Sequence, residues 1–375
     1  MRVVQSVTYA SRHGAFGGPT AVALAQCRAL AERGHEVTLL AGWDGEATLD
    51  VPGVHVLAVE VRPSIPGAGF SGLWSRRLPE AVASALEGAD LAHVHLGRHL
   101  IDSYVARSAQ RRGIPVIAQT HGMVPRPGSL PARMFDALGG LRPLHRARRV
   151  LALTAVEVEE LAAQGLDADR VTQVFNGVDP VPDLARAPRA VPPEVLFLAR
   201  LHPRKRATAF ARMAARLLDR GIEATFAIAG PDEGEAAEVR DIIARSGHAD
   251  AIRYEGPVDQ RDAKRRLARA SVYVLPSVGE VFPMSVLESA AVGTPVVMTH
   301  DCGLAQEFAS AGAAEVTDPA PEALAAAVER LLADASLAAA TAAAATTILE
   351  DRYSARAVAA CLEEIYRAVV PEPVP

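Results

Sequence analysis

Cysteine, lysine and asparagine are scarce in this chain, which has three cysteines, two lysines among its 39 basic residues, and a single asparagine. The cysteines, Cys27, Cys302 and Cys361, lie far apart and show neither disulfide nor metal-ligand spacing, so a disulfide framework and a cysteine metal site are excluded. A reduced, cytoplasmic setting fits this pattern. The near absence of lysine indicates a coding bias toward arginine.

Long apolar runs and strongly basic regions are also missing. No hydrophobic stretch reaches membrane-spanning length, and a strand-like run begins at Arg2 with no signal-peptide pattern before it, so we expect a soluble protein. The net charge is −5 and neither half is strongly basic, which argues against a nucleic-acid partner. The Gly-x-Gly-x-x-Gly dinucleotide fingerprint is absent too.

Strand and helix patterns alternate through both halves of the chain. In the first half, strands are expected at residues 2–8, 35–40, 91–95, 114–120 and 150–154, and a helix at 19–33 that Gly34 ends. Such alternation is typical of an α/β fold with parallel sheets covered by helices on both faces. Because 375 residues exceed the size at which one core keeps growing, two domains are expected.

The proline-rich stretch 177–193 separates the two runs of strands and helices. We therefore expect an N-terminal domain at residues 1–180, a linker at 181–193 that is also a hinge candidate, and a C-terminal domain at 194–353. The final helices are expected at 321–350, including the alanine-rich tract 338–345, and at 354–369.

Two glutamates eight residues apart, Glu280 and Glu288, carry the most information. An apolar strand precedes them; Glu280 ends the loop after that strand, and Glu288 lies on the following helix. These carboxylates can reach different hydroxyls of one extended ligand, while the N–H groups at the helix start hold an anion between them. Hydroxyl, phosphate, hydroxyl describes a nucleotide sugar. The alternative is a pair of solvated surface glutamates.

A second motif lies upstream, in Val195-Leu196-Phe197-Leu198-Ala199-Arg200-Leu201-His202-Pro203-Arg204-Lys205-Arg206. An apolar strand delivers Arg200 at its end, and Lys205 follows at the expected start of a helix. A forked guanidinium beside an ammonium can stabilise the charge of a diphosphate leaving group. The alternative is an exposed helix start, although cations there oppose the helix macrodipole.

These segments resemble family 4 of the retaining glycosyltransferases, which carry Glu-x7-Glu. The resemblance implies the GT-B fold, with two facing Rossmann-like domains, parallel sheets and a cleft between them, and a last helix (354–370) that packs back on the first domain. In the family the first glutamate contacts the donor sugar and the second holds the ribose, roles that fall on Glu280 and Glu288. The family's arginine and lysine on the donor phosphates correspond to Arg200 and Lys205.

The chain departs from the family pattern at two places. Ala199 and Arg206 stand where the family has glycines beside the two cations, which implies a slightly different turn. Phe282-Pro283 stands where the family often has Phe-Gly; proline suits a first helical position but cannot donate to a phosphate. The resemblance then moves the diphosphate contact to Met284, Ser285 or their neighbours.

Further donor-site residues follow from the same resemblance. Gly17 and Gly18 belong to a Gly-Gly turn near the donor phosphate or the acceptor, with an ordinary flexible turn as the alternative. Gly230 and Pro257 begin loops expected around the nucleotide base.

Three histidines and the single asparagine are further candidate site residues. His121, just past an apolar strand, resembles the histidine that faces the transferred sugar. His93 and His95 alternate along another strand and could be core or cleft residues. Asn176 lies in Asn-Gly-Val-Asp, an ordinary turn that the family also has at its interdomain junction.

The resemblance implies a metal-independent glycosyltransferase (EC 2.4) that needs no cofactor and transfers a sugar, with retention of configuration, from a UDP-sugar, or a GDP-sugar, to an acceptor hydroxyl. Its catalytic residues would be His121, Arg200, Lys205 and Glu280. The acceptor loops are expected at 63–74 and 123–131. Polysaccharide, glycolipid and natural-product synthesis are all open, as are two other classes, a sugar-nucleotide epimerase and a catalytically silent nucleotide-sugar binding protein.

The basic stretch from Arg142 to Arg149 has two interpretations. It could touch an anionic acceptor or the inner face of a membrane, giving a weakly peripheral protein, or it is a solvated helix face. The oligomeric state is not indicated by any pattern.

Overall fold

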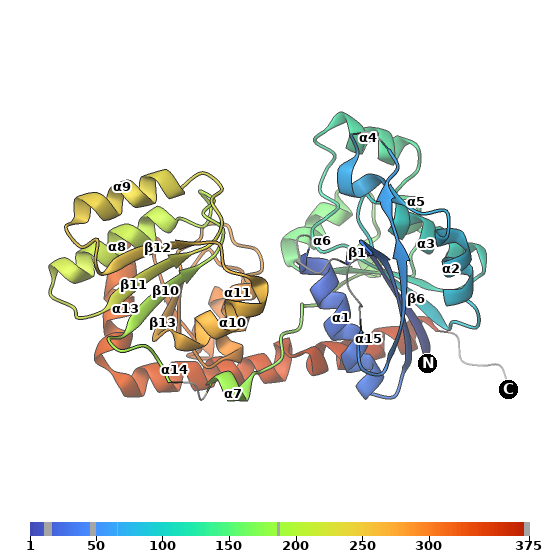
Figure 1. Cartoon of the computed structure of the whole chain (residues 1–375). Coiled ribbons are helices and arrows are strands. Elements are labelled where there is room, and N and C mark those ends of the chain that lie inside the picture. The colour runs from blue at the N-terminus through green and yellow to red at the C-terminus, as the bar shows by residue number, and fades with distance from the viewer. Residues whose placement is uncertain (11–16, 46–49, 66, 186–187, 371–375) are drawn as a thin grey trace. The chain divides into compact units, whose positions relative to one another are not determined.

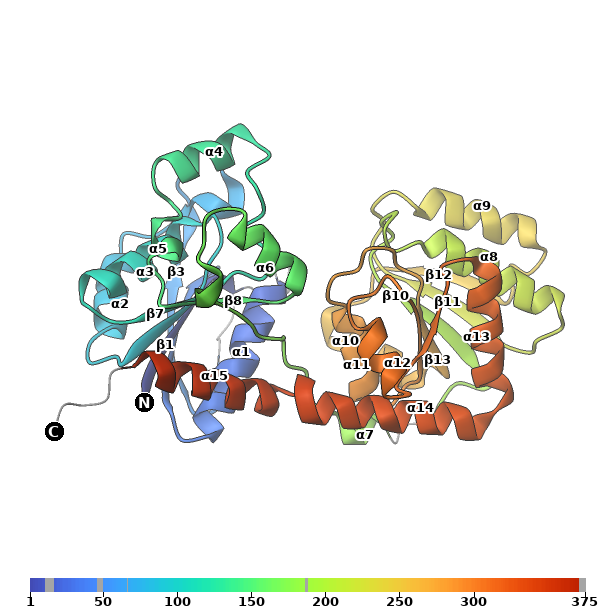
Figure 2. The same ribbon diagram turned by 180° about the vertical axis from the view of Figure 1, so that it is seen from behind.

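The computed structural model describes residues 1–10, 17–45, 50–65, 67–185 and 188–370. The chain divides into two compact units: unit 1 comprises Met1–Gly177 and the segment that begins at Ala355, and unit 2 comprises Val178–Ser354. Each unit is a parallel β-sheet with helices on both faces (Figures 1 and 2).

The described residues of unit 1 form a parallel sheet of seven strands in the order β3-β2-β1-β6-β7-β8-β9. The strands are β1 (Arg2–Ala10), β2 (Glu36–Trp43), β3 (Val54–Glu60), β6 (Leu91–His95), β7 (Val116–Gln119), β8 (Arg149–Ala152) and β9 (Val171–Gln173). A short antiparallel pair, β4 (Arg62–Pro63) and β5 (Leu73–Trp74), lies outside this sheet. β1 lies inside the sheet, where it pairs with β2 on one side and with β6 on the other.

Helices cover both faces of this sheet because its strands are apolar on both sides, as in most parallel sheets. One core cluster joins the sheet to α2 (Leu78–Ala85) and α3 (Leu100–Arg111), and another joins it to α1 (Gly17–Glu32) and α15 (Ala355–Val369). The remaining helices are α4 (Leu130–Ala137), α5 (Arg142–His145) and α6 (Ala155–Ala162). The C-terminal helix is therefore part of unit 1.

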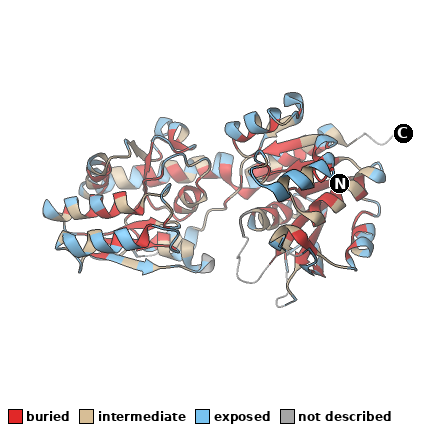
Figure 3. Cartoon of the chain, turned by 90° about the horizontal axis from the view of Figure 1, so that it is seen from above, coloured by how far each residue is buried: buried red, intermediate tan, exposed pale blue. Residues whose placement is uncertain are grey.

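The part of unit 2 that the structure describes has a parallel sheet of six strands in the order β12-β11-β10-β13-β14-β15. The strands are β10 (Glu194–Leu198), β11 (Thr225–Ala229), β12 (Ile252–Gly256), β13 (Val272–Leu275), β14 (Val296–Thr299) and β15 (Glu315–Thr317). The helices are α7 (Pro182–Ala185), α8 (Ala207–Asp219), α9 (Ala236–Ser246), α10 (Gln260–Arg269), α11 (Met284–Ala291), α12 (Ala305–Ser310), α13 (Pro321–Ala333) and α14 (Ala335–Ile348). The helices carry buried residues on one side and exposed residues on the other (Figure 3).

Each sheet reverses its direction of strand addition once. In unit 1 the reversal lies between β1 and β6, and in unit 2 it lies between β10 and β13. In open parallel sheets the loops beyond the carboxyl ends of the strands diverge at such a point and leave room for a ligand. The loops after β10 and β13 contain the two motifs singled out in the sequence.

The helix expected at 321–350 is wrong as a single element. Asp334 has an extended backbone, and its carboxylate accepts hydrogen bonds from the backbone N–H groups of Ser336 and Leu337, which ends α13 and caps α14. A π-helix at Leu349–Tyr353 follows α14. In the part of the chain that the structure describes, no single helix has the length and apolar character to cross a membrane; one pair bent by 103°, Pro321–Ala333 with Ala335–Val369, meets both criteria together.

Of the segment 181–193, expected as a linker, the described residues 181–185 and 188–193 form part of unit 2. Val181 donates its backbone N–H to the Ala291 carbonyl (2.8 Å), and the Arg189 guanidinium donates to the Gly293 carbonyl (2.6 Å). The division of the chain falls instead after Gly177.

Candidate functional site

The two motifs of unit 2 meet in an ion pair between Lys205 and Glu280. Lys205 lies in the turn after β10, and Glu280 lies in the loop after β13, so the contact spans the point where the sheet reverses. The side chains are only 18% and 14% exposed. One of the two lysines of the chain is therefore paired, away from most of the solvent, with the first glutamate of the Glu-x7-Glu motif.

Backbone contacts hold these two loops together. The Arg204 guanidinium donates to the Gly279 carbonyl, and the Arg204 carbonyl accepts from the N–H of Val278 (2.9 Å). On the other side of the loop, the Gly303 N–H donates to the Glu280 carbonyl (2.7 Å), and a Cβ at Gly303 would lie 2.0 Å from the Val281 oxygen. Arg204 and Gly303 were missed in the sequence because their roles depend on loops distant in the chain.

The turn that carries Lys205 differs from the sequence expectation in two respects. Arg206 adopts the left-handed conformation (φ +58°, ψ +47°) that favours glycine. The sequence had predicted a turn different from the family's because Arg206 replaces a glycine, but the backbone at this position is still glycine-like. Lys205 precedes α8 instead of starting it. The first N–H of α8, from Ala207, donates to the buried Glu235 carboxylate (2.8 Å), so a protein side chain, and not a ligand, offsets the cations at this helix start.

Arg200 lies at the carboxyl end of β10, as predicted, but its side chain is 61% exposed and ion-paired with Glu233 (2.8 Å). Glu233 belongs to the segment Gly230–Glu233. The sequence predicted this segment only as a loop near the nucleotide base and gave its acidic residues no role. An exposed pair of this kind contributes little to stability, so Arg200 can exchange Glu233 for a ligand anion at small cost.

Glu288 lies on α11, one turn beyond Ser285, where it is partly buried. Burial raises the pKa of its carboxyl, and the charge of Lys264 partly opposes the shift. None of the described residues donates a hydrogen bond to this carboxylate. A partly buried carboxylate that receives no hydrogen bond from the described residues has its acceptor capacity open to ligand hydroxyls.

The other residues predicted to contact the donor, Phe282 to Ser285, lie at the start of α11. Pro283 is the N-cap, one position before the first helical residue expected for it, and no side chain caps the helix. Ser285 accepts a hydrogen bond from the Tyr273 hydroxyl (2.7 Å), and the Phe282 ring lies 6.1 Å from that of Tyr353. Met284 begins the helix.

Gly230 and Pro257 end neighbouring strands of unit 2. The Gly230 N–H donates to the Gly256 carbonyl (2.7 Å), and its carbonyl accepts from the Tyr254 hydroxyl (3.1 Å). A Cβ at Gly230, which has φ +147°, would lie 1.9 Å from the Ala199 oxygen, so close backbone approach explains the glycine. Pro257 is exposed.

In unit 1, His121 follows β7 and is linked to the centre of the sheet. His121 Nε2 lies 2.6 Å from His95 Nδ1, and His95 Nε2 lies 3.1 Å from Gln5 Oε1. Burial lowers the pKa of His95 well below its ordinary value and that of His121 to about 4. Because Gln5 Oε1 can only accept, neutral His95 carries its proton on Nε2 and accepts on Nδ1, so His121 donates from Nε2.

The His121 turn is held by a buried carboxylate and an amide. Glu157 accepts hydrogen bonds from the Thr120 hydroxyl and the Gly122 N–H, on either side of His121, which has φ +50°. The side chain of Asn176 hydrogen-bonds the His121 ring, which opposes the lowering of its pKa. Asn176, the only asparagine of the chain, therefore positions His121, the histidine that the sequence analysis predicted to face the transferred sugar.

The same network reaches the C-terminal helix. The Tyr366 hydroxyl of α15 lies 2.6 Å from His93 Nδ1 and accepts from Gln5 Nε2 (3.5 Å), and His93 and His95 lie side by side with ring centroids 4.9 Å apart. Burial lowers the pKa of His93 to about 3. The alternation of histidines along β6 could have indicated this network, but its partners on β1 and α15 come from opposite ends of the chain.

Gly17 and Gly18 are the first two residues of α1, so they are helical and not part of the turn expected there. The preceding residues 11–16 lie outside the described part of the chain. Among the described residues, no three His, Cys, Asp or Glu side chains are grouped as metal ligands.

Known proteins resemble both halves of this chain. Residues 192–334 match the family model described as glycosyl transferases group 1, and residues 16–181 match the model described as glycosyltransferase family 4. D-inositol 3-phosphate glycosyltransferase 2 of Catenulispora acidiphila is 30% identical over 79% of this chain and 77% of its own length. D-inositol 3-phosphate glycosyltransferase of Streptomyces coelicolor is 28% identical over 68% of this chain and 64% of its own length.

Solved structures share the fold. Anabaena HepE, crystallised with UDP and glucose, has a TM-score of 0.70 at 18% identity and covers 98% of this chain and 100% of its own. Sucrose-phosphate synthase of Thermosynechococcus elongatus has a TM-score of 0.66 at 18% identity, with 98% and 99% covered. These likenesses confirm the predicted GT-B fold.

Proposed function

The chain belongs to family 4 of the glycosyltransferases, and we propose that it transfers a sugar from a UDP-sugar to an acceptor hydroxyl with retention of configuration. Uridine is proposed as the base because HepE, whose fold the chain shares, was crystallised with UDP and with UDP-glucose. Family membership does not favour an epimerase or a silent binding protein.

The Lys205–Glu280 ion pair is the observation that carries this proposal. It brings an ammonium for a diphosphate and a carboxylate for sugar hydroxyls to one place, beside the strand reversal where parallel sheets bind ligands. Glu288, eight residues on, supplies an acceptor for the ribose hydroxyls. The uncapped start of α11 between the two glutamates offers N–H groups to the diphosphate.

Catalysis in this proposal rests on charge stabilisation and positioning. As the bond between the sugar and the diphosphate breaks, negative charge grows on the leaving oxygen, and Lys205, Arg200 and the α11 N-terminus stabilise it. No protein nucleophile takes part: the acceptor hydroxyl attacks from the face that the diphosphate leaves, and the leaving oxygen accepts its proton. Glu280 orients the transferred sugar.

His121 contributes as a neutral group. Its low pKa keeps the ring uncharged near pH 7, and the ring hydrogen-bonds His95 and Asn176. We therefore assign the contact with the transferred sugar to the main-chain carbonyl of His121, which Glu157 and the left-handed turn hold in place.

The direct test is donor turnover with the purified chain. UDP-glucose, UDP-galactose, UDP-N-acetylglucosamine and GDP-mannose are each supplied with and without D-inositol 3-phosphate, the acceptor class named for the relatives, and UDP or GDP release is measured. We expect acceptor-dependent release from a UDP-sugar, and an NMR spectrum of the product with the anomeric configuration of the donor. Interconversion of the donor without nucleotide release would indicate an epimerase, and binding without any turnover would indicate a silent binding protein.

A further inference from the structure

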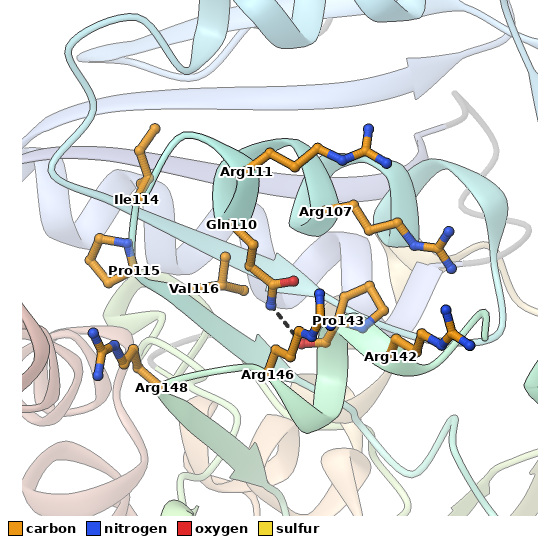
Figure 4. A pocket seen from close by; sticks show the side chains of 11 residues that line it. Arg107, Gln110, Arg111, Ile114, Pro115, Val116, Arg142, Pro143, Arg146 and Arg148 are labelled. Carbon is orange, nitrogen blue, oxygen red and sulfur yellow. Dashed lines mark hydrogen bonds between the residues drawn. The ribbon is translucent and has the colours of Figure 1, made fainter.

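Unit 1 contains a hollow, remote from His121, that is lined by five arginines. The cavity measures about 490 Å³ and lies between the end of α3, the short α5 and the starts of β7 and β8 (Figure 4). Its arginines are Arg107, Arg111, Arg142, Arg146 and Arg148, and no acidic residue lines it.

None of these five arginines forms an ion pair with an acidic residue among the described residues, although all five line the same hollow. A second cavity, in unit 2, offers a direct comparison: its three arginines are each ion-paired, Arg212 with Glu238, Arg216 with Glu322 and Arg245 with Asp241. In a chain whose net charge is −5, five guanidiniums without a carboxylate among them concentrate positive charge around one hollow.

The elements that carry the arginines are fixed to each other by hydrogen bonds. Gln110 donates from Nε2 to the Pro143 carbonyl (2.8 Å), which ties α3 to α5, and Arg107 donates from Nη2 to the Gly139 carbonyl (2.6 Å). Figure 4 shows the first of these bonds as a dashed line among the side chains that line the hollow. The Nε of Arg107 is buried and has no acceptor among the described residues, so one donor of the cluster remains unsatisfied.

Helix electrostatics explains only part of this arrangement. Arg107 and Arg111 lie near the carboxyl end of α3, where a cation is favourable. Arg148 directly precedes β8 and is at no helix end, yet it lines the same cavity. A shared anion would account for all five charges together.

We propose that this pocket binds a compound carrying two or more phosphate groups. The guanidinium fork matches phosphate oxygens in bidentate geometry, and five such groups with no carboxylate among them call for a multiply charged ligand. The cavity volume lies within the range of small-molecule sites, roughly 300–1,000 Å³. The phosphates come either from a soluble molecule or from a lipid headgroup, and both present the same chemistry to the arginines.

The residues that line the pocket include none of the donor-site residues of unit 2, and the pocket lies away from the His121 turn. Pro115 precedes β7 and Val116 begins it, whereas His121 follows its carboxyl end, so the four-residue strand, about 13 Å long, lies between them. Binding at the arginine pocket therefore adds a second anion site at the opposite edge of the unit 1 sheet.

The test compares two triple variants of the full chain. The pocket variant carries Arg111→Gln, Arg146→Gln and Arg148→Gln, all at exposed residues. The control carries Arg76→Gln, Arg77→Gln and Arg133→Gln, also exposed and in unit 1, so the change in net charge is the same. Equal melting temperatures show that both variants fold.

Calorimetry with inorganic pyrophosphate and flotation with phosphatidylcholine vesicles containing cardiolipin give the two readouts. Pyrophosphate bound at the donor site contributes equally to both variants. For a soluble ligand, we expect the pocket variant to bind pyrophosphate at least about tenfold more weakly, while the control stays within about twofold of the wild type. For a lipid source, the control floats with the vesicles and the pocket variant does not. If neither probe separates the pocket variant from the control, the proposal is wrong.

Discussion

Replacing Lys205 with alanine removes one half of the ion pair that joins the loops after β10 and β13. In the proposed site this ammonium stabilises the departing diphosphate, and a charged hydrogen bond of that kind contributes about 2–3 kcal/mol. Its loss is expected to lower kcat/KM for sugar transfer about 30- to 150-fold. Lys205→Arg keeps the charge but changes its shape, so we expect it to restore part of this loss.

The same substitution has a smaller expected effect on folding. Breaking a fully buried ion pair typically costs about 3–5 kcal/mol, whereas a surface pair contributes about 0–1 kcal/mol. Lys205 and Glu280 lie between these cases, with 18% and 14% of their side chains exposed. We therefore expect Lys205→Ala to lower the free energy of unfolding by about 1–3 kcal/mol, measured in urea at 25 °C.

Activity and stability together decide whether the pair belongs to a donor site. Arg212→Ala, which breaks an exposed pair with Glu238, is the matched control and should change transfer less than about twofold. A double-mutant cycle with Glu280→Gln, measured in kcat/KM, should show strong non-additivity because both groups act on one bound donor. If Lys205→Ala remains folded and loses less than threefold in kcat/KM, the proposed diphosphate contact is refuted.

Three further expectations follow from single residues. Ionised Glu288 is a stronger hydrogen-bond acceptor than its protonated form. Because its pKa is raised, donor affinity measured by calorimetry should fall as the pH drops through this pKa, at a higher pH than for an ordinary glutamate, and Glu288→Gln should remove that dependence. His121 has a lowered pKa of about 4, so the folded protein binds a proton there less readily than the unfolded chain. The contribution of His121 to the free energy of unfolding is therefore complete above about pH 6.5 and should fall as the pH drops toward 4. A change of the transfer rate centred near pH 6.5 would contradict a neutral His121. Gly230→Ala should lower the melting temperature far more than Gly234→Ala, because both glycines have positive φ but only the first would place its Cβ 1.9 Å from the Ala199 oxygen; equal effects would contradict the proposed close approach.

The fold class could be predicted from local patterns because most strands are short apolar runs that alternate with helical segments. The five strands expected in unit 1 lie within about three residues of their observed ends, whereas β3 and β9 were not expected. The apolar periodicity that defines a strand is contained in the segment itself. The prediction failed at Asp334, where one side chain caps a new helix inside a stretch of good helix formers. A local cap of this kind is easily overlooked in an alanine-rich segment.

The site could be predicted only in part. The spacing of Glu280 and Glu288 is a property of one loop and one helix, so the sequence was enough to single out both. Arg204, Gly303 and Glu233 were missed because each acts on a loop that is remote in the chain. Their roles exist only after the parallel strands have brought the loops to one edge of the sheet.

By itself, the sequence determined the alternation of strands and helices, the two sheets and the residues that carry the charges of the donor site. Tertiary structure alone decided that Lys205 pairs with Glu280, that Tyr366 of the last helix joins the histidines of β6, and that five arginines from separate elements surround one hollow. The physical reason is that periodicity is a local property of the chain, whereas an ion pair or a pocket depends on distances between segments that only packing establishes.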